Sequence, residues 1–220
     1  MATKADNTGA FRRYVVEFIG TFFLLIAFCM SVQSGLGQFA PVAVGAMLMV
    51  MIYAGAPISG GHYNPAVSLA AYLRGALHLS DLLPYIVAQA LGGTFASMLS
   101  GFLITSMGIA EPTTKELDVV PSLIAEFLGT FALVYVFLNV TTSKKSTGNA
   151  YFGLAIGFTF LTSMYLFSSI SGGAFNPAIA LGITMAGLAS WASIWIFILA
   201  NFVAGALAAF LFQYVNGPEA

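Results

Sequence analysis

Six long apolar stretches dominate this sequence, and each approaches the length of a membrane-spanning helix. They cover roughly Tyr14–Val32, Val42–Pro57, Leu82–Thr105, Ser122–Val140, Ala150–Ser168 and Trp191–Tyr214. A helix needs about 20 mostly apolar residues to cross a bilayer, and the second stretch reaches that length only when residues 39–41 are counted with it. Membrane β-strands are shorter and alternate apolar with polar residues, a pattern that these stretches lack. The sequence therefore predicts an all-α membrane protein with six spanning helices.

The composition supports this class and excludes several others. Charged residues make up 7% of the 220 residues and hydrophobic residues 59%, whereas a soluble domain carries about 25% charged residues. A formal net charge of −1 offers no basic surface to a nucleic acid. The single cysteine, Cys29, excludes a disulfide framework and a cysteine-rich metal site. We therefore expect one transmembrane domain over residues 1–220, in contact with the lipid bilayer.

The motifs of enzymes and cofactor sites do not stand out in this sequence. We find no serine–histidine–aspartate arrangement, no zinc-protease motif, no cysteine cluster and no phosphate-binding loop. We therefore expect a protein that is not an enzyme and that uses neither a metal nor a cofactor.

The positive charges are distributed unevenly between the two sides that six crossings define. Of the 7 Lys and Arg residues, the side of the termini carries Lys4, Arg12, Arg13, Arg74, Lys144 and Lys145. Lys115 alone falls on the other side. Because cytoplasmic loops of membrane proteins are enriched in Lys and Arg, we expect both termini in the cytoplasm. The protein is then a multi-pass protein of the plasma or inner membrane.

Two segments recur in the same order in both halves of the chain. The matching pairs are Glu17–Phe22 with Glu126–Phe131, and Ser59–Leu69 with Ser171–Leu181 at an offset of 112 (176 − 64). The halves, residues 12–105 and 121–214, each contain three of the six stretches. Because three is odd, the second half must be inserted upside down relative to the first. In such an inverted repeat, equivalent segments enter from opposite membrane faces and meet near the midplane.

Each half carries the motif Asn-Pro-Ala, in a loop too apolar to be free in solvent and too short for a span. The motifs are Asn64, Pro65, Ala66 and Asn176, Pro177, Ala178. Asparagine is a strong helix N-cap and proline favours the first helical position, so we expect two short helices ending near Leu73 and Met185. Non-helical backbone at membrane depth requires burial or a water-filled cavity. We expect two re-entrant loops whose short helices point their positive N-terminal ends at each other.

Backbone carbonyls ahead of these short helices can line a file of hydrogen-bond acceptors. They belong to Gly60, Gly61, His62, Tyr63, Gly172, Gly173, Ala174 and Phe175. Each asparagine caps its helix with its oxygen and offers its amide NH2 outward. Such a lumen orients water, and the positive potential at its centre opposes cations and protons.

With two Asn-Pro-Ala motifs, each after Ser-Gly-Gly, in an inverted repeat of six spans, the sequence resembles the aquaporin (major intrinsic protein) family. The resemblance covers nearly the whole chain, from Tyr14 to Tyr214. It implies six helices and two half-helices in a right-handed bundle, one pore per subunit and a homotetramer. It also implies a passive channel whose partners are water and small neutral solutes.

The resemblance also implies a selectivity filter at the outer mouth, and here the sequence departs from the family. Most members carry Arg directly after the second Asn-Pro-Ala, whereas this chain has Ile179. The other filter positions fall on Val44, Met164 and Gly173. Three of the four filter residues are therefore apolar, and the fourth is a glycine without a side chain. Such a filter favours glycerol, urea, ammonia or neutral metalloid hydroxides such as arsenite, with modest water flux. Some family members with apolar filters that lack Arg are associated with metalloids. Glycerol-conducting members carry Asp soon after the second motif, whereas Ala180 and Leu181 follow Ile179 here, so the resemblance does not imply a typical glycerol facilitator.

Two carboxylates inside the spans leave a second function open. Glu17 and Glu126 could relay protons in a proton-coupled secondary transporter, since inverted repeats and broken helices suit that class as well. The family resemblance favours a structural role, in which each carboxylate accepts hydrogen bonds from backbone N–H groups and anchors a re-entrant loop. Their matched positions in the repeat support anchoring. His62, two residues before Asn64, is either a hydrogen-bonded loop residue or part of a gate.

Overall fold

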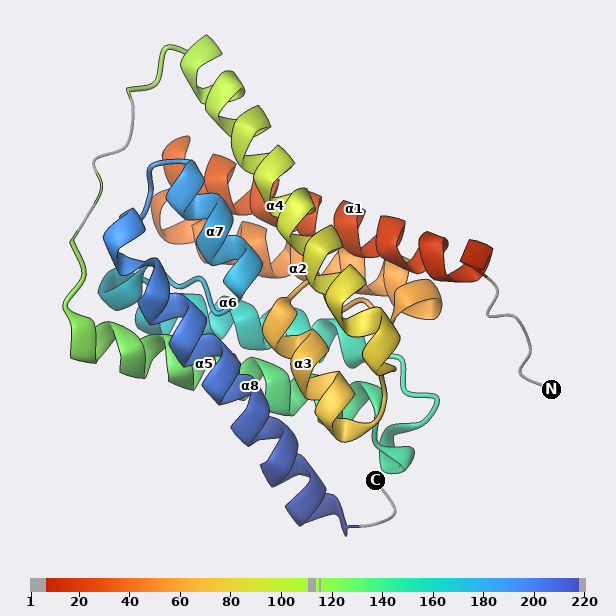
Figure 1. Ribbon diagram of the computed structural model, residues 1–220. Coiled ribbons are helices and arrows are strands. Elements are labelled where there is room, and N and C mark those ends of the chain that lie inside the picture. Colours follow the sequence, from red (N-terminus) through yellow and green to blue (C-terminus); the bar gives the residue numbers. More distant parts are fainter. Residues whose placement is uncertain (1–6, 111–113, 115, 218–220) are drawn as a thin grey trace.

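The computed structural model describes residues 7–110, 114 and 116–217, which form eight α-helices joined by turns and short linkers (Figure 1). The helices are α1 (Asn7–Gln33), α2 (Ala40–Ser59), α3 (Pro65–Arg74), α4 (Leu79–Ser106), α5 (Val119–Thr141), α6 (Phe152–Ser171), α7 (Pro177–Met185) and α8 (Ile194–Asn216). Three single-turn 3-10 helices are η1 (Gly37–Phe39), η2 (Lys144–Ser146) and η3 (Trp191–Ser193). No strand occurs among these described residues, so the all-α class predicted from the sequence is confirmed.

Six of the helices are long and apolar enough to cross a membrane, as the sequence predicts. The second apolar segment covers Gly37–Ser59, or 23 residues, because η1 leads directly into α2. The other two helices are short: α3 has 10 residues and α7 has 9. At 1.5 Å per residue they extend about 15 Å, which is half the thickness of the bilayer core. They end at Arg74 and Met185, within one residue of the predicted ends.

The outside of the bundle is apolar. Less than half of the most apolar window of each spanning helix is buried inside the molecule. Large apolar side chains such as Leu83, Phe102 and Phe210 are exposed. A helix that is apolar all round suits a lipid environment rather than water. The exterior therefore fits a multi-pass membrane protein.

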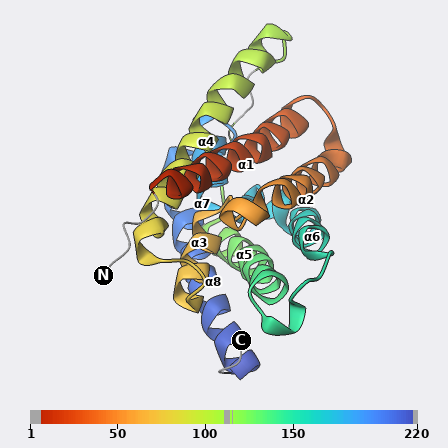
Figure 2. The same ribbon diagram turned by 90° about the vertical axis from the view of Figure 1, so that its right-hand side faces the viewer.

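The helices of the two halves make corresponding contacts. In the first half α1 packs against α2 and α4, and in the second half α5 packs against α6 and α8. The pair α2 and α6 joins the halves, so that α1, α2, α6 and α5 follow one another along one side of the bundle (Figure 2). Each short helix packs against spans of both halves: α3 against α4 and α8, and α7 against the same two helices. This packing holds the two short helices inside the molecule.

The crossing of α2 and α6, one of the contacts between the halves, brings together two glycines at matched positions, Gly45 of α2 and Gly157 of α6. A Cβ added at Gly157 would lie 2.6 Å from the carbonyl oxygen of Gly45, and one at Gly45 would lie 2.7 Å from that of Gly157. Such approaches involve backbone and cannot be relieved by a rotamer change. The crossing of α2 and α6 therefore requires glycine on both sides, as in other close contacts between membrane helices.

The face of the bundle at which α1 begins and α8 ends is called here the termini face. Near the start of α1, Arg13 lies 2.9 Å from Asp81 of α4. Near the end of α8, the ring of Phe212 lies 5.1 Å from the guanidinium carbon of Arg74. The linkers that follow α3 and α5 therefore lie on this face, and η1 and the linker after α7 lie on the opposite face. Two lysines of the charge count, Lys4 and Lys115, lie outside the described residues.

Candidate functional site

The two Asn-Pro-Ala motifs begin the two short helices. The backbone of Asn64 is extended, and its Oδ1 accepts a hydrogen bond from the N–H of Ala66 at 2.8 Å. Asn176 repeats this geometry, with its Oδ1 2.9 Å from the N of Ala178 and 3.4 Å from that of Ile179. These are N-caps that satisfy N–H groups with no partner inside the helix. A proline follows each cap at the first helical position, where its missing N–H costs nothing.

The two caps also bind each other's loop. Nδ2 of Asn64 donates to the carbonyl oxygen of Phe175 at 2.9 Å, and Nδ2 of Asn176 donates to that of Tyr63 at 2.8 Å. The short helices therefore meet end to end, with their N-termini joined by a reciprocal pair of hydrogen bonds. Sequence reasoning did not foresee this pair. Each amide retains a second N–H, and each carbonyl a second lone pair, for a molecule in the lumen.

A buried carboxylate holds the first loop. Oε1 of Glu17 accepts hydrogen bonds from the hydroxyl of Ser59 (2.7 Å) and the N–H of His62 (3.0 Å). Oε2 accepts from the N–H of Tyr63 (2.7 Å) and from Nε2 of Gln89 (2.8 Å). The Glu17 side chain is fully buried, so all four donors replace water. This geometry matches an anchoring role for a side chain that has no solvent-exposed surface.

A second carboxylate holds the second loop in the same way. Glu126 accepts from the hydroxyl of Ser171 (2.6 Å) and from the N–H groups of Ala174 (3.0 Å) and Phe175 (2.7 Å). Ser59 and Ser171 belong to the repeated segments of the sequence, but their hydrogen bonds to the carboxylates were not predicted. Gln89, which donates to Glu17, was missed; at the offset of 112 it corresponds to Asn201 (201 − 89), whose Oδ1 accepts from the hydroxyl of Thr130 at 2.9 Å. A search for polar residues at matched positions of the two halves would have found Gln89 and Asn201.

The carboxylates hold a strained backbone. Tyr63 and Phe175, directly before the caps, have φ of 49° and 47°, and they are the only non-glycine residues with positive φ among the described residues. Bulky residues rarely adopt this conformation, which costs about 1–3 kcal/mol each. The ring of Tyr63 packs over Gly20 and that of Phe175 over Gly129, where a Cβ would overlap it. In this backbone conformation the carbonyl oxygens of both residues accept hydrogen bonds from the opposing caps.

Three cavities lie in succession between the two faces. The termini-face cavity has a volume of about 340 Å³, the central cavity about 10 Å³, and the opposite-face cavity about 460 Å³. Both Asn64 and Asn176 line the central cavity, whose other walls are mostly apolar. A water molecule needs about 10–15 Å³ of such space. The centre of the molecule therefore has room for about one water beside the two amides.

The remaining sequence-predicted residues lie at different depths. Of the filter positions, Met164 lines the opposite-face cavity together with Gly172. Val44 and Ile179 are fully buried and line none of the three cavities. Gly173, in a left-handed conformation, donates from its N–H to the hydroxyl of Ser171.

The loop carbonyl residues are divided between the same cavities. Gly60 and His62 line the termini-face cavity, and Tyr63 joins His62 at the central one. Gly61, Ala174 and Phe175 are buried and line none of the three. The His62 ring is hydrogen-bonded through Nδ1 to the hydroxyl of Ser68 at 3.1 Å.

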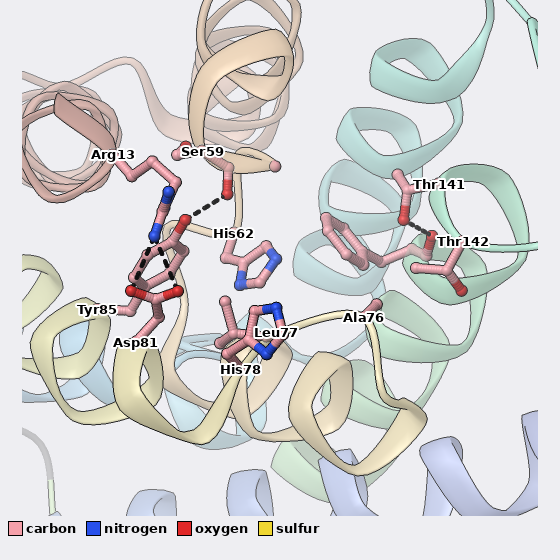
Figure 3. A pocket seen from close by; sticks show the side chains of 12 residues that line it. Arg13, Ser59, His62, Ala76, Leu77, His78, Asp81, Tyr85, Thr141 and Thr142 are labelled. Atoms are coloured by element: carbon pink, nitrogen blue, oxygen red, sulfur yellow. Dashed lines mark hydrogen bonds and ion pairs between the residues drawn. The ribbon is translucent and has the colours of Figure 1, made fainter. Parts of the chain in front are cut away.

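The termini-face cavity is the polar one (Figure 3). Both carboxylate oxygens of Asp81 lie 2.9 Å from Nη2 of Arg13, and one also accepts from the hydroxyl of Tyr14 at 2.8 Å. On the same side, the hydroxyl of Tyr85 donates to the carbonyl of Ser59 at 2.7 Å. The ion pair leaves little net charge at this mouth. Sequence reasoning counted Arg13 as a membrane-face charge and missed its partner, Asp81.

A bundle of six spans with two re-entrant helices meeting at an amide-lined centre, between cavities at both faces, defines a membrane channel. A profile of the family described as "Major intrinsic protein" matches residues 3–212 of this chain. The chain is 37% identical to Aquaporin NIP1-1 of Oryza sativa subsp. japonica, over 94% of this chain and 76% of that protein. It is 34% identical to Glycerol uptake facilitator protein-like 6 of Lactiplantibacillus plantarum, over 94% of this chain and 100% of that protein.

Solved structures give the same fold. The aquaglyceroporin from Plasmodium falciparum superposes with a TM-score of 0.82 at 21% identity, over 95% of this chain and 98% of that chain. This chain belongs to the major intrinsic protein family. It is a passive channel for water and small solutes and not an enzyme. The proton-coupled transporter, which the two buried glutamates left open, finds no support.

Proposed function

We propose that this channel conducts small uncharged solutes, such as glycerol, urea, ammonia or neutral metalloid hydroxides, with a modest water flux. The observation that carries the proposal is the absence of charge at the opposite-face mouth. No Asp, Glu, Lys, Arg or His is among the described residues that line its cavity of about 460 Å³. The filter positions assigned from the sequence are Val44, Met164, Gly173 and Ile179, which likewise carry no charge. Similarity to a protein named a glycerol uptake facilitator supports this solute class.

An apolar filter acts on water and on solutes differently. Without an arginine, the filter offers no donor that replaces the hydration of a passing molecule, and an apolar ring also slows water by dewetting. A neutral solute with its own apolar surface loses less on contact with Met164, which lines the opposite-face cavity. The filter therefore favours solutes that combine hydroxyl or amide groups with carbon or a neutral metalloid centre.

Exclusion of ions then depends on the centre of the lumen. The N-terminal ends of α3 and α7 carry partial positive charge and lie on either side of the amides of Asn64 and Asn176. Cations meet this potential in a cavity too small to keep their hydration shell. We infer that the centre excludes protons and cations although the filter lacks its arginine.

Stopped-flow light scattering on proteoliposomes tests the proposal. We expect glycerol and urea permeabilities well above those of protein-free vesicles, linear in the solute gradient and independent of a proton gradient. Water permeability should rise less than solute permeability. Fast water flux with no solute uptake would overturn the proposal, and saturating, proton-dependent uptake would indicate a coupled transporter.

We also infer that the termini face is cytoplasmic, in the plasma or inner membrane. The described basic residues are Arg12 and Arg13 near the start of α1, Arg74 at the end of α3, and Lys144 and Lys145 in the linker after α5. Cysteine introduced at partly exposed Ser146 or at exposed Leu36 tests this orientation, because the native Cys29 is buried. An impermeant maleimide added to intact cells should label Leu36→Cys and spare Ser146→Cys. The reverse pattern would contradict the orientation.

The proposal includes the organisation of the assembly. We infer one channel domain built from the inverted repeat of residues 12–105 and 121–214, with four copies assembled as a homotetramer. The corresponding contacts of α1 and α5 support the repeat, and the exposed apolar helix faces are available for packing against other copies. Native mass spectrometry from detergent should show a species of four chains of 23.1 kDa each. A monomer alone under gentle conditions would contradict the tetramer.

A further inference from the structure

The termini-face cavity and the central cavity share two lining residues, His62 and Phe137. No residue in the described part of the chain lines both the central cavity and the opposite-face cavity. The side chains of His62 and Phe137 therefore stand at the boundary where about 340 Å³ narrows to about 10 Å³. Of the sequence-derived filter positions, Met164 lines the opposite-face cavity and none lines this boundary, so the boundary is separate from them.

The two side chains form a packed aromatic pair. Their ring centroids lie 5.4 Å apart at an interplanar angle of 89°, an edge-to-face contact. Phe137 is 2% exposed and His62 is 8% exposed. The His62 ring is further held by Ser68 through Nδ1 and by the edge of Tyr85 at 5.3 Å. With His62 fixed on the re-entrant loop, the width of the passage depends on the side chain of Phe137 on α5.

The inverted repeat shows that this arrangement is specific to one end. The position equivalent to Phe137 in the first half is Phe28, since 137 − 28 equals 126 − 17. Phe28 lines only the opposite-face cavity. The residue equivalent to His62 at the offset of 112 is Ala174, which has no ring to complete a pair. Among the described residues, these two pairs of positions therefore give an aromatic pair between a wide cavity and the centre at the termini-face end alone.

We propose that Phe137, positioned against His62, is a second size-selecting constriction, placed in series with the filter of the opposite face. The inference rests on the proposed function, because it concerns the passage of solute through the same lumen. A solute larger than water reaches Asn64 and Asn176 from the termini face only when the ring of Phe137 moves aside. Phe137 thus sets the upper size limit for neutral solutes such as glycerol, while water passes with little hindrance.

The test compares variants of the full chain in proteoliposomes, with glycerol and water permeability normalised to the amount of protein reconstituted. Phe137→Ala should raise glycerol permeability roughly tenfold, the effect of a barrier about 1.4 kcal/mol lower, and should change water permeability much less. Phe137→Leu should give an intermediate rise and Phe137→Trp a fall. The series includes smaller and larger side chains than Phe, so if one variant fails to fold, the others still test the proposal.

Phe197→Ala is the matched control. Phe197 is as fully buried as Phe137 but lines none of the three cavities. This variant loses the same packing, and its ratio of glycerol to water permeability should equal that of the parent. The proposal is overturned if glycerol permeability does not follow the size of residue 137, or if Phe197→Ala raises the ratio equally.

The same experiment separates this proposal from the function on which it rests. If the parent passes no glycerol but Phe137→Ala does, the proposed solute function is wrong and the constriction is supported. If the parent passes glycerol and the Phe137 series is flat, the constriction is wrong and the function stands. If neither the parent nor any Phe137 variant passes glycerol, both are wrong.

Discussion

The short side chains of Asn64 and Asn176 each make two kinds of hydrogen bond. The oxygen caps a helix, and the amide nitrogen reaches across to the carbonyl of the opposite loop. Aspartate would cap equally well but could not donate, and glutamine would reach too far to cap. Asparagine is therefore the residue that both starts a short helix and joins it to its counterpart, which explains its presence at both positions.

Replacing either asparagine by alanine should weaken both functions. Asn64→Ala or Asn176→Ala removes an N-cap worth about 1 kcal/mol and leaves the carbonyl of Phe175 or Tyr63 without its partner. We expect a lower melting temperature in detergent and reduced glycerol flux in proteoliposomes. Asn139→Ala is the control, because Asn139 bonds only to Tyr135 and Asn216. Unchanged flux in both variants would show that the amides do not border the conduction pathway.

The buried glutamates give a second prediction at this scale. Glu17→Gln replaces one carboxylate oxygen with an NH2 group, which then faces the N–H of Tyr63 or the amide of Gln89. Hydrogen bonds to charged groups contribute about 1.5–3 kcal/mol, so the melting temperature should fall by several degrees. Glu116→Gln, at an exposed position, should leave it unchanged. Equal melting temperatures for parent and Glu17→Gln would remove Glu17 from the role of loop anchor.

At the scale of single elements, the close crossing of α2 and α6 is a packing contact that can be tested by a single substitution. Gly157→Ala places a Cβ against the backbone of Gly45, which has no flexible end to move away. We expect the helices to separate and the melting temperature to fall. Gly101→Ala in α4 is the matched control, since nothing lies within 4 Å of the added Cβ. There alanine should be neutral or stabilising, because it has the higher helix propensity; a larger loss there than at Gly157 would contradict the packing argument.

The elements themselves could largely be predicted from the sequence. Length and apolarity determine the six spans, and Asn-Pro determines where α3 and α7 begin, because both signals are local. The partners of the loops could not be predicted in this way. Gln89 reaches Glu17 from α4, and the cap of α3 finds its acceptor in Phe175, more than 100 residues away in sequence. These contacts depend on how the spans pack, and the widths of the cavities depend on side-chain positions that no local pattern encodes.

At the scale of the whole molecule, the two halves share one plan but build different mouths. Both halves supply a glutamate, a capped short helix and a strained residue before the cap. The termini-face mouth is lined by an ion pair and by His62, whereas the opposite mouth has no charged residue among those described. A repeat that positions the centre symmetrically thus leaves each mouth free to select solutes in its own way.

Two constrictions in one lumen lead to a prediction that neither makes alone. Resistances in series add, so the narrower constriction determines the flux. Ile179→Arg should narrow the filter of the opposite face and lower glycerol permeability, because a long charged side chain replaces a buried aliphatic one. In that background Phe137→Ala should bring little further gain, although it raises glycerol permeability in the parent.

Glycerol permeability of the parent, the two single variants and the double variant decides between a series and an independent arrangement. If the effects of Phe137→Ala and Ile179→Arg multiply, the two residues act on separate routes or on folding, and a shared lumen is contradicted. If Ile179→Arg leaves solute uptake at the parent level in a folded protein, Ile179 does not lie at the filter. A double variant that behaves as Ile179→Arg alone is the expected result, since a molecule delayed at one end gains nothing from a wider passage at the other.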